Sequence, residues 1–197
     1  MDISPRLEII DTAAHALSIH VDDYTTKRIA RVSDGFPHFI HLVCEKLFWI
    51  VYNDPRSGMR ASPDHFDKAV AEAVEDIQPY LRKPYEKATR KYTNDSEPIL
   101  WAIADTHELQ RRSADIYKSY ERIVGSMGGA PLTREKFNAR INNLKTPAWG
   151  SIVTASRTGW YEYREKMMRG YARLRSEQQG VELESEHPLQ ARRFGIN

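Results

Sequence analysis

The chain has 197 residues, with 29 Lys and Arg against 27 Asp and Glu, a length that holds one large domain or two small ones that each bury a core. No apolar run approaches the roughly 18 residues of a membrane span, and the opening MDISPRLEII lacks the basic and apolar order of a secretory signal. Cys44 is the only cysteine, which excludes an internal disulfide and favours a reducing compartment, so we expect a cytoplasmic protein with no membrane partner.

Four helices are predicted in residues 1–78. The first begins at Ser4, followed by a proline at the first helical position, and the second is capped by Asp22 or Asp23 and ends at Gly35. Pro37 opens a third helix that is apolar on most of its circumference, which is typical of the central helix of a bundle. Ser62 and Pro63 start the fourth. We therefore expect a compact helical bundle in this segment.

A second pattern follows a helical linker predicted at residues 79–95. Ser96 is predicted to cap one helix, a second covers 113–126, and a third begins at Thr133 with Lys136 in its first turn. The period then changes, because SIVTAS and WYEYR are β-rich runs joined through Arg157-Thr158-Gly159. Three helices followed by a hairpin are typical of a winged helix-turn-helix, expected here over 96–178 with a last helix at its end. Residues 179–197 are expected to form a flexible tail. The predicted fold class is mainly α: a four-helix bundle plus a winged helix-turn-helix with a short β-hairpin.

The segment VSDGFPHFIHLVCEKL, at the start of the third predicted helix, resembles the helical lid subdomain of AAA+ ATPases. In such lids this entrance often carries an arginine, called sensor 2, that reaches the nucleotide phosphates. The resemblance implies nucleotide sensing at Gly35, Pro37 and His38, with a histidine in place of that arginine. A lid over 1–78 followed by a winged helix is also similar to the C-terminal part of initiator and helicase-loader ATPases.

No GxxxxGK[ST] phosphate-binding loop occurs in the chain, and no apolar strand ends in paired carboxylates for Mg²⁺. We therefore expect this chain to be no enzyme by itself and to hold no cofactor. The resemblance implies that ATP and Mg²⁺ bind an AAA+ core that lies upstream or on another chain, and that core is an expected partner.

Positive charge is concentrated near the end of the chain. Residues 133–175 hold 10 Lys and Arg against 3 acidic residues, whereas residues 1–110 hold 13 against 18. Turning Phe137, Ile141 and Leu144 inward leaves amide and basic side chains on the outer face of that helix, where they suit base edges and phosphates. Double-stranded DNA is the expected partner, and the predicted contacts are Lys136, Asn138, Asn142, Asn143, Arg157, Arg164, Lys166 and Arg169.

The sequence also allows other functions for the winged helix and for the third predicted helix. Glu135 also faces outward and repels phosphate, so the winged helix is alternatively a protein-interaction adaptor that docks on a partner subunit. A free-standing transcriptional regulator is a third possibility. His38, His41 and Glu45 share one side of a helix, yet further ligands are missing and no metal is expected. Cys44 is predicted to be a buried, inert thiol.

Aromatic side chains cluster around the predicted hairpin. Trp149 precedes it, and strand alternation sets Trp160 on one face with Tyr161 and Tyr163 on the other. They are expected to close the small core under the wing, with stacking on unpaired bases as the alternative.

Overall fold

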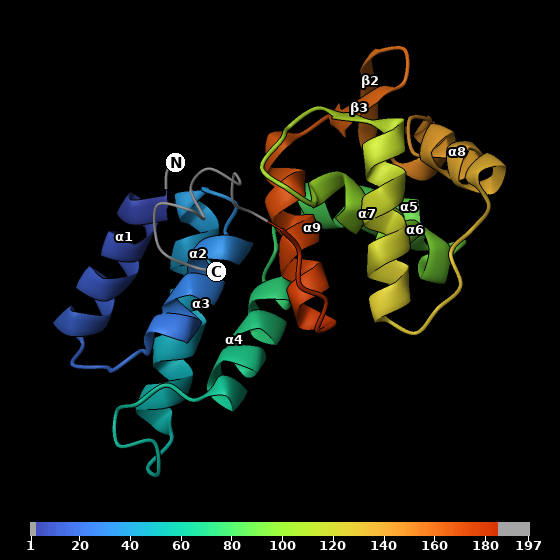
Figure 1. Cartoon of the computed structure of the whole chain (residues 1–197). Helices are drawn as coiled ribbons and strands as arrows, with labels where there is room; N and C mark the ends of the chain where they lie inside the picture. Colours follow the sequence, from blue (N-terminus) through green and yellow to red (C-terminus); the bar gives the residue numbers. More distant parts are fainter. Residues whose placement is uncertain (1–2, 185–197) are drawn as a thin grey trace. The chain divides into compact units, whose positions relative to one another are not determined.

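The computed structural model describes residues 3–184, which form nine α-helices, one 3-10 helix and three short strands. The prediction of a mainly helical chain is confirmed, and the sheet is small and antiparallel. By internal contacts the described chain divides into two compact units, residues 3–77 with 177–179, and residues 78–176 with 180–184. Figure 1 shows the helices and strands of the two units.

The first unit contains four helices: α1 (Ile3–Ala16), α2 (Asp23–Val32), α3 (Pro37–Asn53) and α4 (Pro63–Glu75). Asp22 caps α2 by accepting a hydrogen bond from the Thr25 N–H at 2.9 Å. Ser62 caps α4, and the His65 side chain completes the capping box. The expected cap at Ser4 is wrong, because α1 already begins at Ile3 and Ser4 lies within it. Short polar caps therefore fix two of the three predicted helix starts that depend on them.

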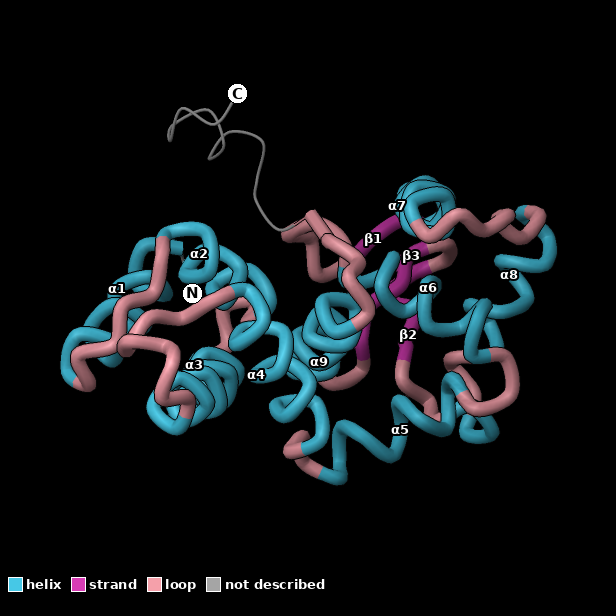
Figure 2. Tube along the Cα trace, turned by 90° about the horizontal axis from the view of Figure 1, so that it is seen from below, coloured by secondary structure: helices cyan, strands magenta, loops and turns pink. Residues whose placement is uncertain are grey.

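Helix α3 is the central helix of this unit, as its apolar composition predicts. Phe39, Ile40, Val43, Leu47 and Val51 are buried along it. It contacts α1, α2 and α4, and both views show it between α1 and α4 (Figures 1 and 2). Cys44 is also buried, as expected for a thiol on this helix.

The second unit begins with α5 (Pro79–Thr89) and α6 (Thr93–Ala104), followed by β1 (Arg111–Arg112) and α7 (Ser113–Ser126). Next come α8 (Arg134–Asn143), the 3-10 helix η1 (Pro147–Trp149), β2 (Val153–Arg157), β3 (Trp160–Tyr163) and α9 (Lys166–Gln178). The strand order is β1-β3-β2, so β3 lies between two antiparallel neighbours. The hairpin of β2 and β3 matches the prediction, whereas the two-residue strand β1 was not predicted. Figure 2 shows α5 and α7 on opposite sides of this unit.

Two boundaries of the second unit differ from the sequence prediction. Helix α6 starts at Thr93, three residues before the predicted cap at Ser96, because the Ser96 N–H already donates to the Tyr92 carbonyl at 2.7 Å. No side chain caps this helix, so a rule that looks for a cap misplaces its start. The helix predicted as a linker, α5, buries Leu81, Tyr85 and Ala88 on one side and packs against η1 within the second unit.

The segment expected as a flexible tail is packed as far as it is described. Val181 and Leu183 are buried, and Glu184 pairs through its backbone with Thr106 and with the Asp105 carboxylate. Burial of two apolar side chains explains why the chain is held here. The remainder of the predicted tail, 185–197, lies outside the described residues.

Candidate nucleic-acid interface

Helix α8 presents a polar face because its apolar stripe is buried. Thr133 caps it by accepting from the Lys136 N–H at 3.5 Å, and Phe137 and Ile141 are fully buried. Leu144, just past the end of the helix, is also buried. These three anchors, at the predicted spacing, leave exposed side chains on the opposite face: Glu135, Lys136, Ala139 and Asn142.

The asparagines predicted as DNA contacts are partly used inside the unit. Asn138 is half-buried, and its Oδ1 accepts a hydrogen bond from the Ser113 hydroxyl at 3.2 Å. Asn142 is exposed, and its Oδ1 accepts from the Tyr161 hydroxyl at 3.3 Å. Asn143 is half-buried at the end of α8, where its carbonyl accepts from Thr146. Of the three, Asn142 has the side chain best placed to meet a ligand.

The hydrogen bond between Asn142 and Tyr161 also joins α8 to the hairpin. Tyr161 and Tyr163 are buried on one side of β3, and the Tyr163 hydroxyl donates to the Leu100 carbonyl at 2.6 Å. This confirms that both tyrosines close the core under the hairpin. Trp160 is half-buried on the alternate position of the strand, as its register predicts.

Trp160 lies between two arginines. Its cross-strand partners are Arg112 on β1 and Arg157 on β2. The guanidinium carbons lie 5.0 Å and 3.9 Å, respectively, from the Trp160 ring centroid. Both arginines are exposed, so the ring orients two cations on the outside of the sheet. Arg157 was predicted from the sequence. Arg112 was not, because only the pairing of β1 with β3 brings it to this site.

Fewer of the Lys and Arg side chains of residues 133–175 are exposed than their number in the sequence indicates. Arg164 is exposed and its Nε donates to the Ser151 carbonyl at 2.9 Å, and Lys166 is exposed at the first position of α9. Arg169 is only 4% exposed, and its guanidinium donates to the carbonyls of Thr106 and His107. The prediction that Arg169 contacts DNA is therefore wrong, since its guanidinium is buried and donates to two backbone carbonyls.

Other arginines of the block are also held within the unit. Arg173 is buried and donates to the Thr106 carbonyl, and Arg175 pairs with Glu97 at 2.8 Å. On α8 itself, the guanidinium carbon of Arg140 lies 3.5 Å from the ring centroid of Tyr92, and Arg134 donates to the Ser113 hydroxyl. The exposed cations of the candidate interface are Arg112, Lys136, Arg157, Arg164 and Lys166, and the half-buried Lys145 has its ammonium 5.5 Å from the Tyr161 ring centroid.

One acidic group stands on the same face. Hydrogen bonds from its own backbone N–H and from the Thr133 hydroxyl lower the pKa of Glu135, which keeps its carboxylate ionised. An ionised Glu135 beside Lys136 repels a phosphate. The positive charge that Lys136 gives this face is therefore partly offset.

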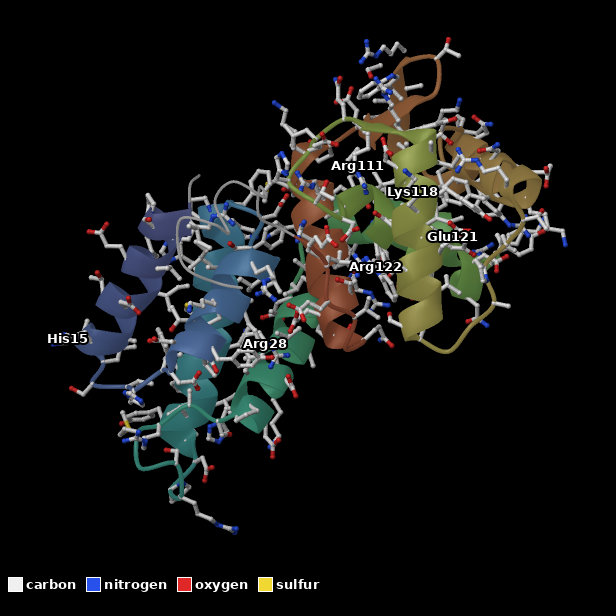
Figure 3. All side chains as sticks on the ribbon, in the orientation of Figure 1. His15, Arg28, Arg111, Lys118, Glu121 and Arg122 are labelled. Carbon is white, nitrogen blue, oxygen red and sulfur yellow. The ribbon has the colours of Figure 1, made fainter. Side chains whose placement is uncertain are left out.

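Two further arginines of this unit, Arg111 and Arg122, form contacts that stabilise its fold (Figure 3). Arg111, next to the exposed Arg112, is buried and donates to the Ala102 carbonyl and, at 3.0 Å, to the Ser119 hydroxyl. Arg122 pairs with the buried Asp105 at 2.7 Å. Alternation along β1 thus sends one arginine inward and the next outward.

The residues predicted for nucleotide sensing lie in the first unit. Gly35 has a left-handed backbone with φ of 79°, which favours glycine, and Pro37 is the first residue of α3. His38 is exposed, and its ring contacts Phe39 edge-on at 5.3 Å. His38 is therefore accessible at the start of α3. Within the described chain no group of three or more His, Cys, Asp or Glu side chains is placed to hold a metal ion.

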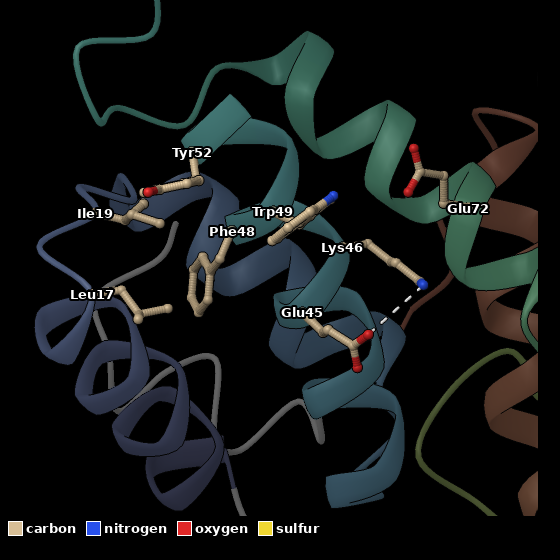
Figure 4. A pocket seen from close by; sticks show the side chains of 8 residues that line it. All are labelled: Leu17, Ile19, Glu45, Lys46, Phe48, Trp49, Tyr52 and Glu72. Carbon is tan, nitrogen blue, oxygen red and sulfur yellow. Dashed lines mark ion pairs between the residues drawn. The ribbon is translucent and has the colours of Figure 1, made fainter. Parts of the chain in front are cut away.

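The first unit also carries an apolar groove of about 640 Å³ (Figure 4). Its floor and walls include Leu17, Ile19, Phe48, Trp49 and Tyr52, and the rings of Trp49 and Tyr52 stack at 6.4 Å although both are about two-thirds exposed. Carboxylates dominate its rim: Glu45 and Glu72 line it, and its one ammonium, Lys46, pairs with Glu45 and with Asp76.

Comparison of the chain with models of protein families, with curated proteins and with solved structures gives no match. Among helices in residues 3–184, none has the length and apolar character needed to cross a membrane.

Proposed function

We propose that the second unit is a winged helix-turn-helix module that binds duplex DNA. Helix α8 would be the recognition helix, and the hairpin of β2 and β3 would be the wing. The order helix, strand, helix, helix, strand, strand from α6 to β3 supports this, as does the central position of β3 in the sheet.

The observation that carries the proposal is the hydrogen bond between Asn142 and Tyr161. It holds α8 against the inner face of β3, and on the outer face of the same strand Trp160 orients Arg112 and Arg157. A duplex that accepts α8 in its major groove then meets a pair of oriented cations at the wing. Lys136 and the Asn142 amide would contact base edges or phosphate, and Arg157 would contact the backbone or minor groove.

For the first unit we propose the role of an AAA+-like lid, based on its resemblance to such lids. Its four helices, and the left-handed Gly35 followed by Pro37 at the start of α3, support a lid-like role. In this proposal the lid transmits the nucleotide state of an ATP-binding core to the DNA-binding unit. Neither unit would carry out covalent chemistry.

Fluorescence anisotropy of a labelled duplex, titrated with the full chain, tests the DNA-binding part. The test variant is Lys136→Ala, Asn142→Ala, Arg157→Ala, and the control is Lys27→Ala, Asn53→Ala, Arg56→Ala, which removes the same residue types from exposed positions of the first unit. We expect at least about a tenfold loss of affinity in the test variant and little change in the control. Equal affinities of the two variants, or no binding at low salt, would refute the proposal.

A second candidate function is a protein-interaction adaptor. The observation that favours it is the groove of the first unit, so we place the docking site there and not on the winged helix. Exposed stacked aromatics are unusual on a surface with no partner. Because carboxylates outnumber the single ammonium at the rim, the occupant that fits is an amphipathic segment with Lys or Arg beside its apolar residues.

This candidate is tested with two synthetic amphipathic peptides that share one apolar stripe, flanked by Lys in one and by Glu in the other. The Lys peptide is expected to bind the wild-type chain and to bind Trp49→Ala at least about tenfold more weakly, since exposed aromatic anchors dominate such interfaces. Equal binding of the two peptides, or no effect of Trp49→Ala, would exclude a docking role for this groove.

A further inference from the structure

A cavity of about 540 Å³ lies between α5 and η1 in the second unit. It is lined mainly by cationic side chains from the second half of α5 and the residues that follow it, together with the indole of Trp149. The volume lies within the range of small-ligand sites. None of these residues belongs to the face of α8 or to the wing.

Among the described residues, acidic side chains do not neutralise the cations of this cavity. Lys83 and Lys87 lie one turn apart on the same side of α5, and Arg90 and Lys91, just past the end of the helix, add two further positive charges. All four side chains are exposed, and across residues 3–184 none of them forms an ion pair with an acidic residue. The one carboxylate of the lining, Glu86, pairs with Arg82 at 3.9 Å. Lys83 and Lys87 repel one another at this spacing, whereas Lys87 and Arg90 at the end of α5 also complement the helix dipole.

The other wall of the cavity is aromatic and rigidly held. The Trp149 ring stacks on Tyr92 with centroids 5.6 Å apart and planes 11° apart, and Arg140 covers Tyr92. Next to it, Gly150 has φ of 78°, and a Cβ there would lie 2.6 Å from the Pro84 carbonyl oxygen. The backbone of η1 therefore lies directly against α5, which fixes the indole beside the row of cations.

We propose that this cavity binds a nucleotide, with its phosphates on Lys83, Lys87, Arg90 and Lys91 and its base against Trp149. Unneutralised ammonium and guanidinium groups suit phosphate oxygens, and a fixed indole offers a stacking surface for any base. The nucleotide is either free or one unit of a single strand, since both present the same phosphate and base. This site is independent of the duplex-binding face proposed above.

The test is calorimetric titration of the full chain at low salt with three probes: ATP without metal, inorganic pyrophosphate and a single-stranded thymidine octamer. The variant Lys83→Glu, Lys87→Glu changes only exposed side chains and is expected to bind ATP or the octamer at least tenfold more weakly. Trp149→Leu is expected to weaken ATP or octamer binding severalfold while leaving pyrophosphate binding unchanged. Tighter binding of ATP identifies a free nucleotide as the ligand, and tighter binding of the octamer identifies a strand.

Two controls make the result specific. Lys27→Glu, Lys68→Glu makes the same charge change at exposed lysines of the first unit and is expected to bind as the wild type does. The Lys136→Ala, Asn142→Ala, Arg157→Ala variant should keep nucleotide binding even if it loses the duplex, so the two proposals fail separately. The proposal is overturned if neither ATP nor the octamer binds, if the charge-reversed variant binds them as tightly as the wild type, or if Trp149→Leu changes neither.

Discussion

The guanidinium carbon of Arg157 lies 3.9 Å from the ring centroid of Trp160, its partner across the hairpin. Arg112 approaches the same ring from the neighbouring strand at 5.0 Å. An arginine at a hairpin end is ordinarily free to adopt many rotamers. Here the ring restricts both guanidinium groups, so less entropy is lost when they meet an anion.

Replacing the ring tests this role. Trp160→Leu is expected to weaken duplex binding about two- to fivefold, because a cation over an exposed ring contributes about 0.5–1 kcal/mol. Anisotropy titrations of the wild type and the variant measure the change. Trp49→Leu, at an exposed position of the first unit, serves as the control and should not alter the affinity. A Trp160→Leu chain with wild-type affinity would show that the ring does not orient the arginines for binding.

Adjacent arginines of β1 should differ strongly in their effect on stability. Arg111→Leu leaves the buried Ala102 carbonyl and Ser119 hydroxyl without this donor, so we expect the free energy of unfolding of the second unit to fall by about 2–4 kcal/mol. Arg112→Leu changes an exposed side chain and should cost about 0.5 kcal/mol or less. Urea unfolding followed by circular dichroism measures both, and similar losses for the pair would contradict this assignment of an inward and an outward arginine.

Two glycines with nearly the same backbone test the contact between η1 and α5. Gly150 and Gly159 have φ of 78° and 76°, so an alanine at either position adds about 1–2 kcal/mol of strain. Only at Gly150 does the new Cβ also clash, at 2.6 Å from Pro84, whereas Gly159 has nothing within 4 Å. Gly150→Ala should therefore lower stability by about 1–3 kcal/mol more than Gly159→Ala in thermal or urea unfolding. If the two variants were equally stable, η1 would not be packed against α5 as described.

The buried thiol of Cys44 predicts a dependence of stability on alkaline pH. Burial raises the pKa of Cys44 from its ordinary 9.0 to about 12. Between these values the unfolded chain loses the thiol proton while the folded chain keeps it. The contribution is therefore complete below pH 9.0 and declines as pH rises toward 12, by at most about 1.4 kcal/mol per pH unit.

Cys44→Ala removes this contribution. Its free energy of unfolding, measured in urea from pH 7.5 upward, should decline less steeply above pH 9 than that of the wild type. Titration of the tyrosines affects both chains alike, so the difference between the two curves isolates the thiol. Parallel curves would mean that Cys44 is accessible to water in the folded chain.

The sequence predicts those parts of the fold that local chemistry determines. Capping at Asp22, Ser62 and Thr133 and the apolar spacing of Phe137 and Ile141 all act within a few residues, and each is found as expected. The hairpin is likewise a local structure. The start of α6 is misplaced because that helix has no side-chain cap for the sequence to reveal.

The candidate sites depend on contacts between distant residues, which local patterns do not contain. Arg169 looks like a surface cation until the carbonyls of residues 106 and 107 close over its guanidinium. Arg112 joins the interface only because β1, a strand of two residues, pairs with β3. The α5 cations become a site only where Trp149, about 60 residues along the chain, is packed beside them.

Salt dependence of duplex binding tests the central claim most directly. Anisotropy titrations of the wild type, Arg157→Ala and the control Arg56→Ala, repeated over a series of salt concentrations, give one slope of log affinity against log salt for each chain. We predict a linear fall for the wild type, a slope shallower by about 1 for Arg157→Ala, and an unchanged slope for Arg56→Ala. If the duplex does not bind at low salt, or all three slopes coincide, the second unit does not hold DNA through α8 and the wing.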